Sequence, residues 1–329
     1  MRRPRKDLPD KPNEGQSGAM PRGARVPGAG AWPSGLSAAL VLALSALALS
    51  GCGGAASAAT GTAGKKAPLA GAHPITVVAS VFPLAQLISY IGGDDVHVID
   101  LVSPGVQPQD LALRASQGEL VRSAALVVDV GDGYQPQVES AALSAHNHLA
   151  VLPAISHQAQ PYEFWLDPYL MAKAADVITA SLVAADPSAR RQFHNGNLDF
   201  QSVASSIESD FVNSLSQCQT AYFITSDDAF GRMASSFDLV DVPLSSAGAT
   251  QALSAITMHN LPSVFGEDGV PSGAVDELAR RAHISVQTLD PLELTPAGAG
   301  ANESYFSLME QDLSAMQNPL LCQNDDSFQ

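Results

Sequence analysis

The chain has 329 residues, enough for two domains of ordinary size. Hydrophobic residues make up 46% of the chain and charged residues 15%, a composition typical of globular proteins. The formal net charge is −16, and the part from Cys52 onward carries 10 basic and 30 acidic side chains, a net charge of −20. Such an acidic surface argues against nucleic-acid binding. It is compatible with cation binding, although acidic surfaces usually serve only solubility.

The N-terminal part is predicted to be a signal peptide (1–51) followed by a lipid anchor and flexible tether (52–73). Leu36–Leu49 is an apolar run of signal-peptide length, and it ends in Leu49-Ser50-Gly51-Cys52, which resembles a bacterial lipobox. Cys52 would carry the lipid and become the mature N-terminus. The alternative is an uncleaved helix with a chance cysteine. The distant basic residues favour a translation start at Met20.

From Ile75 onward the pattern predicts alternating strands and helices, which indicates parallel sheets covered on both faces. The expected strands are Ile75–Ser80, Val96–Val102, Ala125–Val130, Ala150–Leu152, Ala221–Thr225, Leu239–Val242, Ser263–Phe265 and Ser285–Leu289. The expected helices are Leu84–Ile91, Gln117–Arg122, Pro168–Ala184, Ala229–Ser236, Thr250–His259, Ser272–His283 and Tyr305–Met316.

A long helix is predicted from about Pro187 to Leu215, because Phe200, Val203, Ile207, Phe211 and Leu215 recur at spacings of three and four. At this length it would span about 40 Å, more than one small lobe needs. Gly196 weakens the helix assignment. We therefore expect two α/β lobes, residues 74–185 and 217–329, joined by a connecting helix at 186–216, with ligands bound beyond the carboxyl ends of the strands.

The segment Glu163-Phe164-Trp165-Leu166-Asp167-Pro168 places an acidic residue beside two aromatic residues, and Asp167 with Pro168 is a favourable helix start. The segment is similar to the His-x-Trp-Leu-Asp-Pro signature of the substrate-binding lipoproteins of zinc and manganese ABC importers. Val78-Ala79-Ser80-Val81-Phe82-Pro83-Leu84, Ser226-Asp227-Asp228-Ala229-Phe230-Gly231 and Leu289-Asp290-Pro291-Leu292 match further blocks in order. The resemblance implies two α/β lobes, each with a mainly parallel sheet flanked by helices, a rigid connecting helix, and a metal site between the lobes.

The histidine ligands of that family are replaced in this chain. Gln109 stands at the first histidine position, Glu163 at the second and Asp227 at the third, and Glu293 is the nearest candidate for a fourth, acidic ligand. The family implies zinc or manganese, whereas an all-oxygen set favours Mn²⁺, Mg²⁺ or Ca²⁺. The alternative is a site that has lost metal binding and only lines a wet cleft.

The remaining cysteines, Cys218 and Cys322, are expected to form a disulfide, because the chain is predicted to be exported and relatives with cysteines here are bridged. Two free thiols or a soft-metal pair is the alternative. His146 and His148 are either a weak metal-collecting remnant or merely solvated side chains.

The sequence therefore predicts a lipid-anchored receptor on the extracytoplasmic face of a bacterial membrane. It would be a monomer, would deliver a divalent metal ion to an ABC-transporter permease, and would have no enzymatic activity, since no Gly-x-Ser-x-Gly, phosphate loop or Cys/His nucleophile pair is present. The rival interpretation is a surface adhesion or interaction lipoprotein that has kept the scaffold without metal transport.

Overall fold

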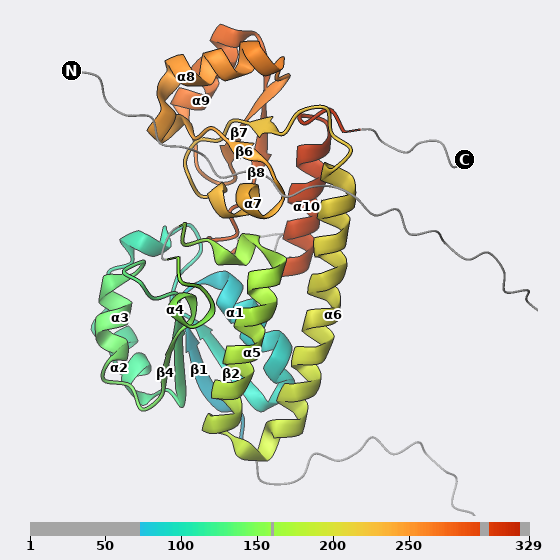
Figure 1. Cartoon of the computed structure of the whole chain (residues 1–329). Helices are drawn as coiled ribbons and strands as arrows, with labels where there is room; N and C mark the ends of the chain where they lie inside the picture. The colour runs from blue at the N-terminus through green and yellow to red at the C-terminus, as the bar shows by residue number, and fades with distance from the viewer. Residues whose placement is uncertain (1–72, 159–160, 297–302, 323–329) are drawn as a thin grey trace, which may run out of the picture. The chain divides into compact units, whose positions relative to one another are not determined.

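The first half of the folded chain is built around a four-stranded parallel sheet (Figure 1). The structure is a computed structural model that describes residues 73–158, 161–296 and 303–322. The sheet order is β2-β1-β3-β4, with β1 at Ile75–Ala79, β2 at Val96–Asp100, β3 at Leu126–Asp129 and β4 at His148–Ala150.

Apolar side chains project from both faces of this sheet, as is typical of a buried parallel sheet. Val77 and Ala79 belong to the main core, whereas Val78, between them, belongs to a separate cluster with Val121 and Val138. The helices of this half are α1 (Phe82–Gly92), α2 (Ala115–Ser123), α3 (Pro136–Ala142), α4 (Val151–Ile155) and α5 (Pro168–Ala185).

The predicted long helix is α6, Arg190–Leu215, which follows a short 3-10 turn at Pro187–Ala189. Phe193, Phe200, Phe211 and Leu215 are buried along one side of it, and it packs against α5, α1 and α10 (Tyr305–Gln317) (Figure 1). Gly196 does not weaken this helix. Its bare backbone lets α6 approach α1 closely, because a Cβ there would lie 2.8 Å from the Ile91 Cα.

The second half contains two short parallel strand pairs. In the first, β5 (Tyr222–Phe223) pairs with β6 (Val240–Asp241); in the second, β7 (Ser263–Glu267) pairs with β8 (Ser285–Leu289). The Phe265 N–H donates to the Ile224 oxygen at 2.8 Å and so links the two pairs. Helices α7 (Gly231–Ser236), α8 (Leu244–His259) and α9 (Gly273–Ala282) complete this half, with a kink in α8 at Gly248.

The α/β class, the parallel sheets and the long helix are thus confirmed, with a few local corrections. The predicted strand Ala150–Leu152 is wrong beyond Ala150, since Val151 opens α4; a short apolar run fits either structure. Helix α3 was not predicted, and β5 and β6 are shorter than expected. The signal peptide, the tether, Met20 and Cys52 lie outside the described residues.

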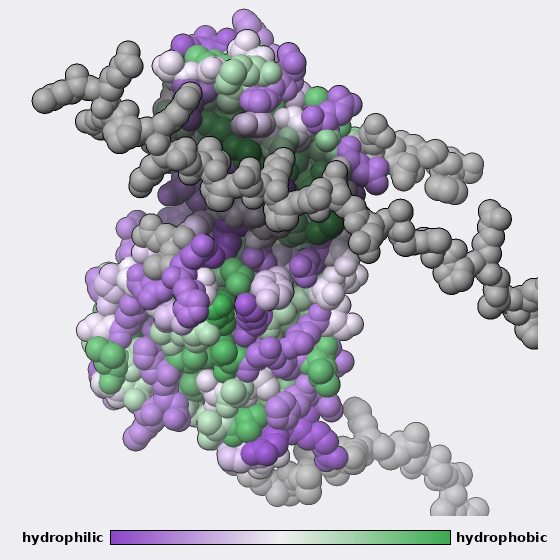
Figure 2. All heavy atoms as spheres, in the orientation of Figure 1, coloured by the Kyte–Doolittle hydropathy of each residue, from purple (hydrophilic) through white to green (hydrophobic). Residues whose placement is uncertain are grey.

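On the face shown in Figure 2, hydrophilic and hydrophobic residues are interspersed over the part that contains α2 to α5 in Figure 1. Leu143 and Leu198 are among the large apolar side chains that are exposed. Of the helices in the described part of the chain, none combines the length and the apolar composition needed to cross a membrane.

Candidate functional site

Gln109 lies in a 3-10 turn, Pro108–Asp110, that follows the loop after β2. The turn is held by Gln135, whose Nε2 donates to the Pro108 oxygen at 3.0 Å and to the Ser80 oxygen at 3.1 Å. From there Gln109 reaches across to the second half: its Nε2 donates to Glu293 Oε2 at 3.3 Å and to Tyr134 Oη at 3.2 Å. The structure therefore brings two of the predicted site residues, Gln109 and Glu293, into direct contact.

Glu163 lies immediately before the 3-10 turn Phe164–Leu166 and is only 6% exposed. The segment leading to it is anchored by Arg232 of α7, whose Nε donates to the Pro161 oxygen at 2.9 Å. Glu163 lies beside Glu293, which is 4% exposed, and the two carboxyl groups are hydrogen-bonded to each other. Two predicted ligands that are far apart in sequence thus meet in the buried interior.

Asp227 follows β5, and its Oδ1 accepts the Ala229 N–H at 3.1 Å. It faces Glu163 closely enough to repel its charge and is hydrogen-bonded to Glu267, the last residue of β7. Glu267 also accepts from Gln107 Nε2 at 3.4 Å. Sequence reasoning missed Glu267, although its position at the carboxyl end of a parallel strand was an available signal.

Three carboxyl groups of this cluster, those of Glu163, Glu267 and Glu293, hold their protons more tightly than free carboxyl groups. Burial, with a smaller contribution from Asp228 and Asp227, raises the pKa of Glu163 to about 7. Burial and repulsion by Glu163 raise the pKa of Glu293 to about 8, while burial and the Asp227 charge raise the pKa of Glu267 to about 8. A bound cation would therefore compensate the negative charge that these carboxyl groups carry when they are ionised.

The arrangement is not a preformed metal cage. Across the residues that the structure describes, no three His, Cys, Asp or Glu side chains are placed so that they could hold one metal ion together. Each carboxyl group is engaged instead with a neighbouring carboxyl or amide group. Gln109 also presents its amide nitrogen to Glu293, so ligation through its oxygen requires the amide to rotate.

The other sequence candidates occupy different places. Cys218 and Cys322 form a disulfide, which confirms the predicted pairing and excludes two free thiols. His148 is exposed at the start of β4, and its Nε2 lies 2.7 Å from Oδ2 of the fully buried Asp129. His146 is exposed.

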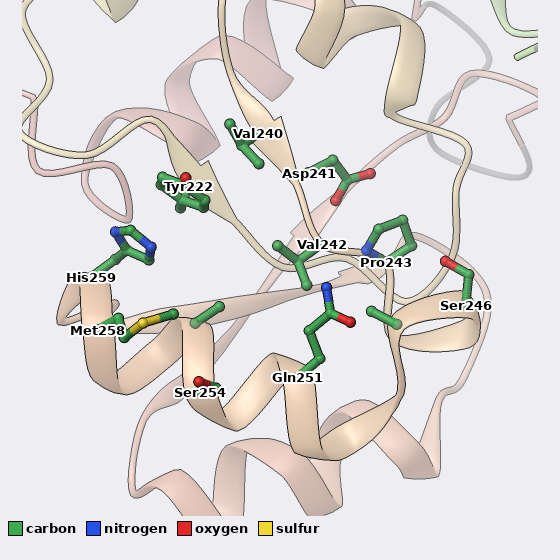
Figure 3. A pocket seen from close by; sticks show the side chains of 12 residues that line it. Tyr222, Val240, Asp241, Val242, Pro243, Ser246, Gln251, Ser254, Met258 and His259 are labelled. Carbon is green, nitrogen blue, oxygen red and sulfur yellow. The ribbon is translucent and has the colours of Figure 1, made fainter. Parts of the chain in front are cut away.

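A cavity of about 410 Å³ lies elsewhere, between β6 and α8 (Figure 3). Its lining is largely apolar, with Val240, Val242 and Met258, and Asp241 is its one acidic residue. Asp241 Oδ1 is already bonded to the Thr225 hydroxyl at 2.7 Å. The chemistry suited to a bare cation is therefore at the carboxyl cluster and not in this cavity.

The chain is similar to known zinc-binding proteins. The high-affinity zinc uptake system protein ZnuA of Bacillus subtilis (strain 168) is 26% identical over 176 residues, which are 50% of this chain and 55% of that protein. The zinc-binding lipoprotein AdcA of Streptococcus pneumoniae (strain ATCC BAA-255 / R6) is 22% identical over 276 residues, 74% of this chain and 55% of AdcA. The chain thus spans about half the length of these curated relatives.

The fold is shared with solved structures. The crystal structure of a zinc-bound ZnuA with residues 138–173 deleted superposes with a TM-score of 0.68 at 21% identity, covering 76% of this chain and 100% of that one. The model of the zinc-uptake complex component A, a periplasmic protein, matches residues 77–318. Because that match extends over most of the chain, the protein belongs to the family of the periplasmic zinc-uptake component ZnuA.

Proposed function

We propose that the protein is the extracytoplasmic substrate-binding component of a metal-ion ABC importer and carries a divalent cation as its cargo. The observation that supports this most directly is the meeting of Glu163 and Glu293, two of the predicted ligands, in the buried interior. Gln109 and Asp227 complete the proposed ligand set. The protein would act without catalysis, as a monomer lipid-anchored through Cys52, and would deliver its cargo to a permease.

The proposed cargo is a hard cation such as Mn²⁺, Mg²⁺ or Ca²⁺, since carboxylate and amide oxygens suit these ions better than Zn²⁺. Binding would displace the protons that the carboxyl groups now share and bring the oxygens around one centre. We further propose lobes at 74–185 and 217–329 with a connecting helix at 186–216, and little closure on binding, because α6 is one stiff element.

Elemental analysis of the purified chain, followed by thermal unfolding with Mn²⁺, Ca²⁺ and Zn²⁺ in turn, tests the proposal. A cation at a hundredfold excess over its Kd should stabilise the chain by about 2.7 kcal/mol. The double variant Glu163→Ala, Asp227→Ala should lose that gain. No recovered metal together with no stabilisation by any divalent ion would contradict metal carriage and favour an adhesion or interaction lipoprotein.

A further inference from the structure

Glu293 stands at the end of a tightly held turn. Leu292, just before it, has a left-handed backbone with φ 58°, which non-glycine residues rarely adopt. The Leu292 N–H donates to Asp290 Oδ1 at 2.7 Å, and the Asp290 N–H donates to Oδ1 of the buried Asp312 at 2.9 Å. This backbone persists because its surroundings fix it, and such backbones cluster at functional sites.

The third bond on this turn comes from the other half of the chain. The fully buried Trp165 donates its indole Nε1–H to the Pro291 oxygen at 2.8 Å. Trp165 is itself fixed, because the Tyr305 hydroxyl donates to its carbonyl oxygen at 2.7 Å and the Tyr134 ring packs edge-on against the indole with centroids 5.9 Å apart. The indole therefore cannot shift without breaking contacts on both sides.

The bond between Trp165 and Pro291 joins two chain segments that each carry one of the predicted ligands. Trp165 lies two residues after Glu163, and Pro291 lies two residues before Glu293. The indole–carbonyl bond thus joins the two segments at equal distances along the chain from the two carboxyl groups. An apolar ring alone would fill the space, but only an N–H directed at Pro291 sets the position of one segment against the other.

We infer that Trp165 is a positioning residue for the cation site: its indole N–H, bonded to the Pro291 carbonyl, sets the spacing of Glu163 and Glu293. This inference rests on the proposed function. Trp165 touches no cation in this scheme and acts only through the Glu293 turn, with Asp312 holding that turn from its opposite side. Outer-shell groups of this kind orient ligands, and their loss typically weakens metal affinity about 10–100-fold.

Mn²⁺ titrations by calorimetry on chelator-treated chains test the role. Trp165→Phe keeps a ring in the core and removes the N–H, and it should weaken Mn²⁺ binding about 10–100-fold. Phe193→Leu, a change in a fully buried ring of α6, is the control for lost stability alone and should leave the Mn²⁺ Kd unchanged. If Trp165→Phe does not fold, Asp312→Ala should show the same weakening, while Asp312→Asn, which keeps an acceptor oxygen, should not.

A double-mutant cycle separates positioning from general damage. If Trp165 acts through Glu293, then adding Trp165→Phe to Glu293→Gln should change the Kd by less than about threefold. An equal loss in both backgrounds, or an equal loss in Phe193→Leu, would overturn the inference. If Glu163→Gln and Glu293→Gln themselves leave the Mn²⁺ Kd unchanged, the proposed site fails. If those two variants weaken Mn²⁺ binding and Trp165→Phe does not, the positioning role is refuted while the proposed site is retained.

Discussion

Glu163 and Glu293 are buried side by side; burial makes both harder to ionise, and Glu163 makes Glu293 harder still to ionise. A charge removed from water is unfavourable unless a partner of opposite sign compensates it; Arg232 attracts the Glu163 charge, but burial outweighs this attraction, because the pKa of Glu163 is raised overall. Arg232, nearby, is committed to the Pro161 oxygen. The pair therefore lowers the stability of the cation-free chain and provides the attraction for a cation.

Replacing Glu293 by Gln should have opposite effects on stability and on binding. The amide keeps an oxygen for Gln109 and removes the charge, so we expect the cation-free chain at about pH 8 to gain about 1 kcal/mol, or about 2–4 °C in Tm. The stabilisation by Mn²⁺ should become smaller. Thermal unfolding with and without Mn²⁺ measures both effects, and Glu310→Gln, at an exposed position of α10, is the matched control. A lower Tm with unchanged Mn²⁺ stabilisation would show that Glu293 is only a structural acid.

At the scale of elements, α6 shows how a residue unfavourable for helix formation can be required by packing. Gly196 lies in the second turn of a helix of 26 residues, where glycine is about 1 kcal/mol less favourable than alanine. The neighbouring backbone of α1 at Ile91 leaves no room for a side chain. Close packing of two helices thus outweighs local propensity at this position.

Gly196→Ala should therefore destabilise the chain by about 1–3 kcal/mol, although alanine is the better helix former. Gly118→Ala in α2 is the matched control, because a Cβ there meets only the end of Arg122 at 3.6 Å, an ordinary contact. It should be neutral or stabilising by up to about 1 kcal/mol. Urea unfolding of both variants checks the contrast, and equal effects would mean that α1 and α6 are not packed this closely.

The elements that could be predicted are those whose signals are local. Helix α5 begins where Asp167 and Pro168 predicted, because the Asp167 carboxylate accepts the Tyr169 and Leu170 N–H groups. The spacing of the buried phenylalanines located α6 equally well. Local signals could not distinguish strand from helix at Val151, nor reveal that Gly196 meets Ile91, which depends on contacts distant in sequence.

The candidate site was predictable only in part for the same reason. Glu163 was predicted from its position in a family motif and Glu293 as the nearest acidic residue after the last matched block, and the two are close together. Glu267 has no such motif and enters the cluster only because β7 ends there. The orientation of the Gln109 amide and the Trp165–Pro291 bond depend on packing between the halves, which no spacing within one segment encodes.

For the whole molecule, the buried acids should determine how stability depends on pH. Burial raises the pKa of Glu163 and Asp241 to about 7 and the pKa of Glu267 and Glu293 to about 8. Between about pH 5 and pH 8 the folded chain therefore holds more protons than the unfolded chain. Their contribution to the free energy of unfolding is greatest near pH 5 and falls as pH rises, the reverse of the usual effect of paired carboxylates.

Urea unfolding of the chelator-treated chain at about pH 5.5 and about pH 8 should thus give the larger free energy of unfolding at the lower pH. Saturating Mn²⁺ should reduce this difference, because the cation replaces the lost protons. The variant Glu163→Gln, Glu293→Gln should show a weaker dependence. Stability that rises from pH 5.5 to pH 8 without a cation would contradict the raised pKa values.

The place of Trp165 has a practical consequence. The sequence contains two tryptophans, and the other, Trp32, precedes Cys52. Cleavage at the proposed lipobox would leave a single indole chromophore, seated beside the carboxyl cluster and hydrogen-bonded to the backbone that leads to Glu293. Its ultraviolet emission would then be a built-in optical reporter of cargo loading and release, free of background from any other tryptophan and requiring no attached dye.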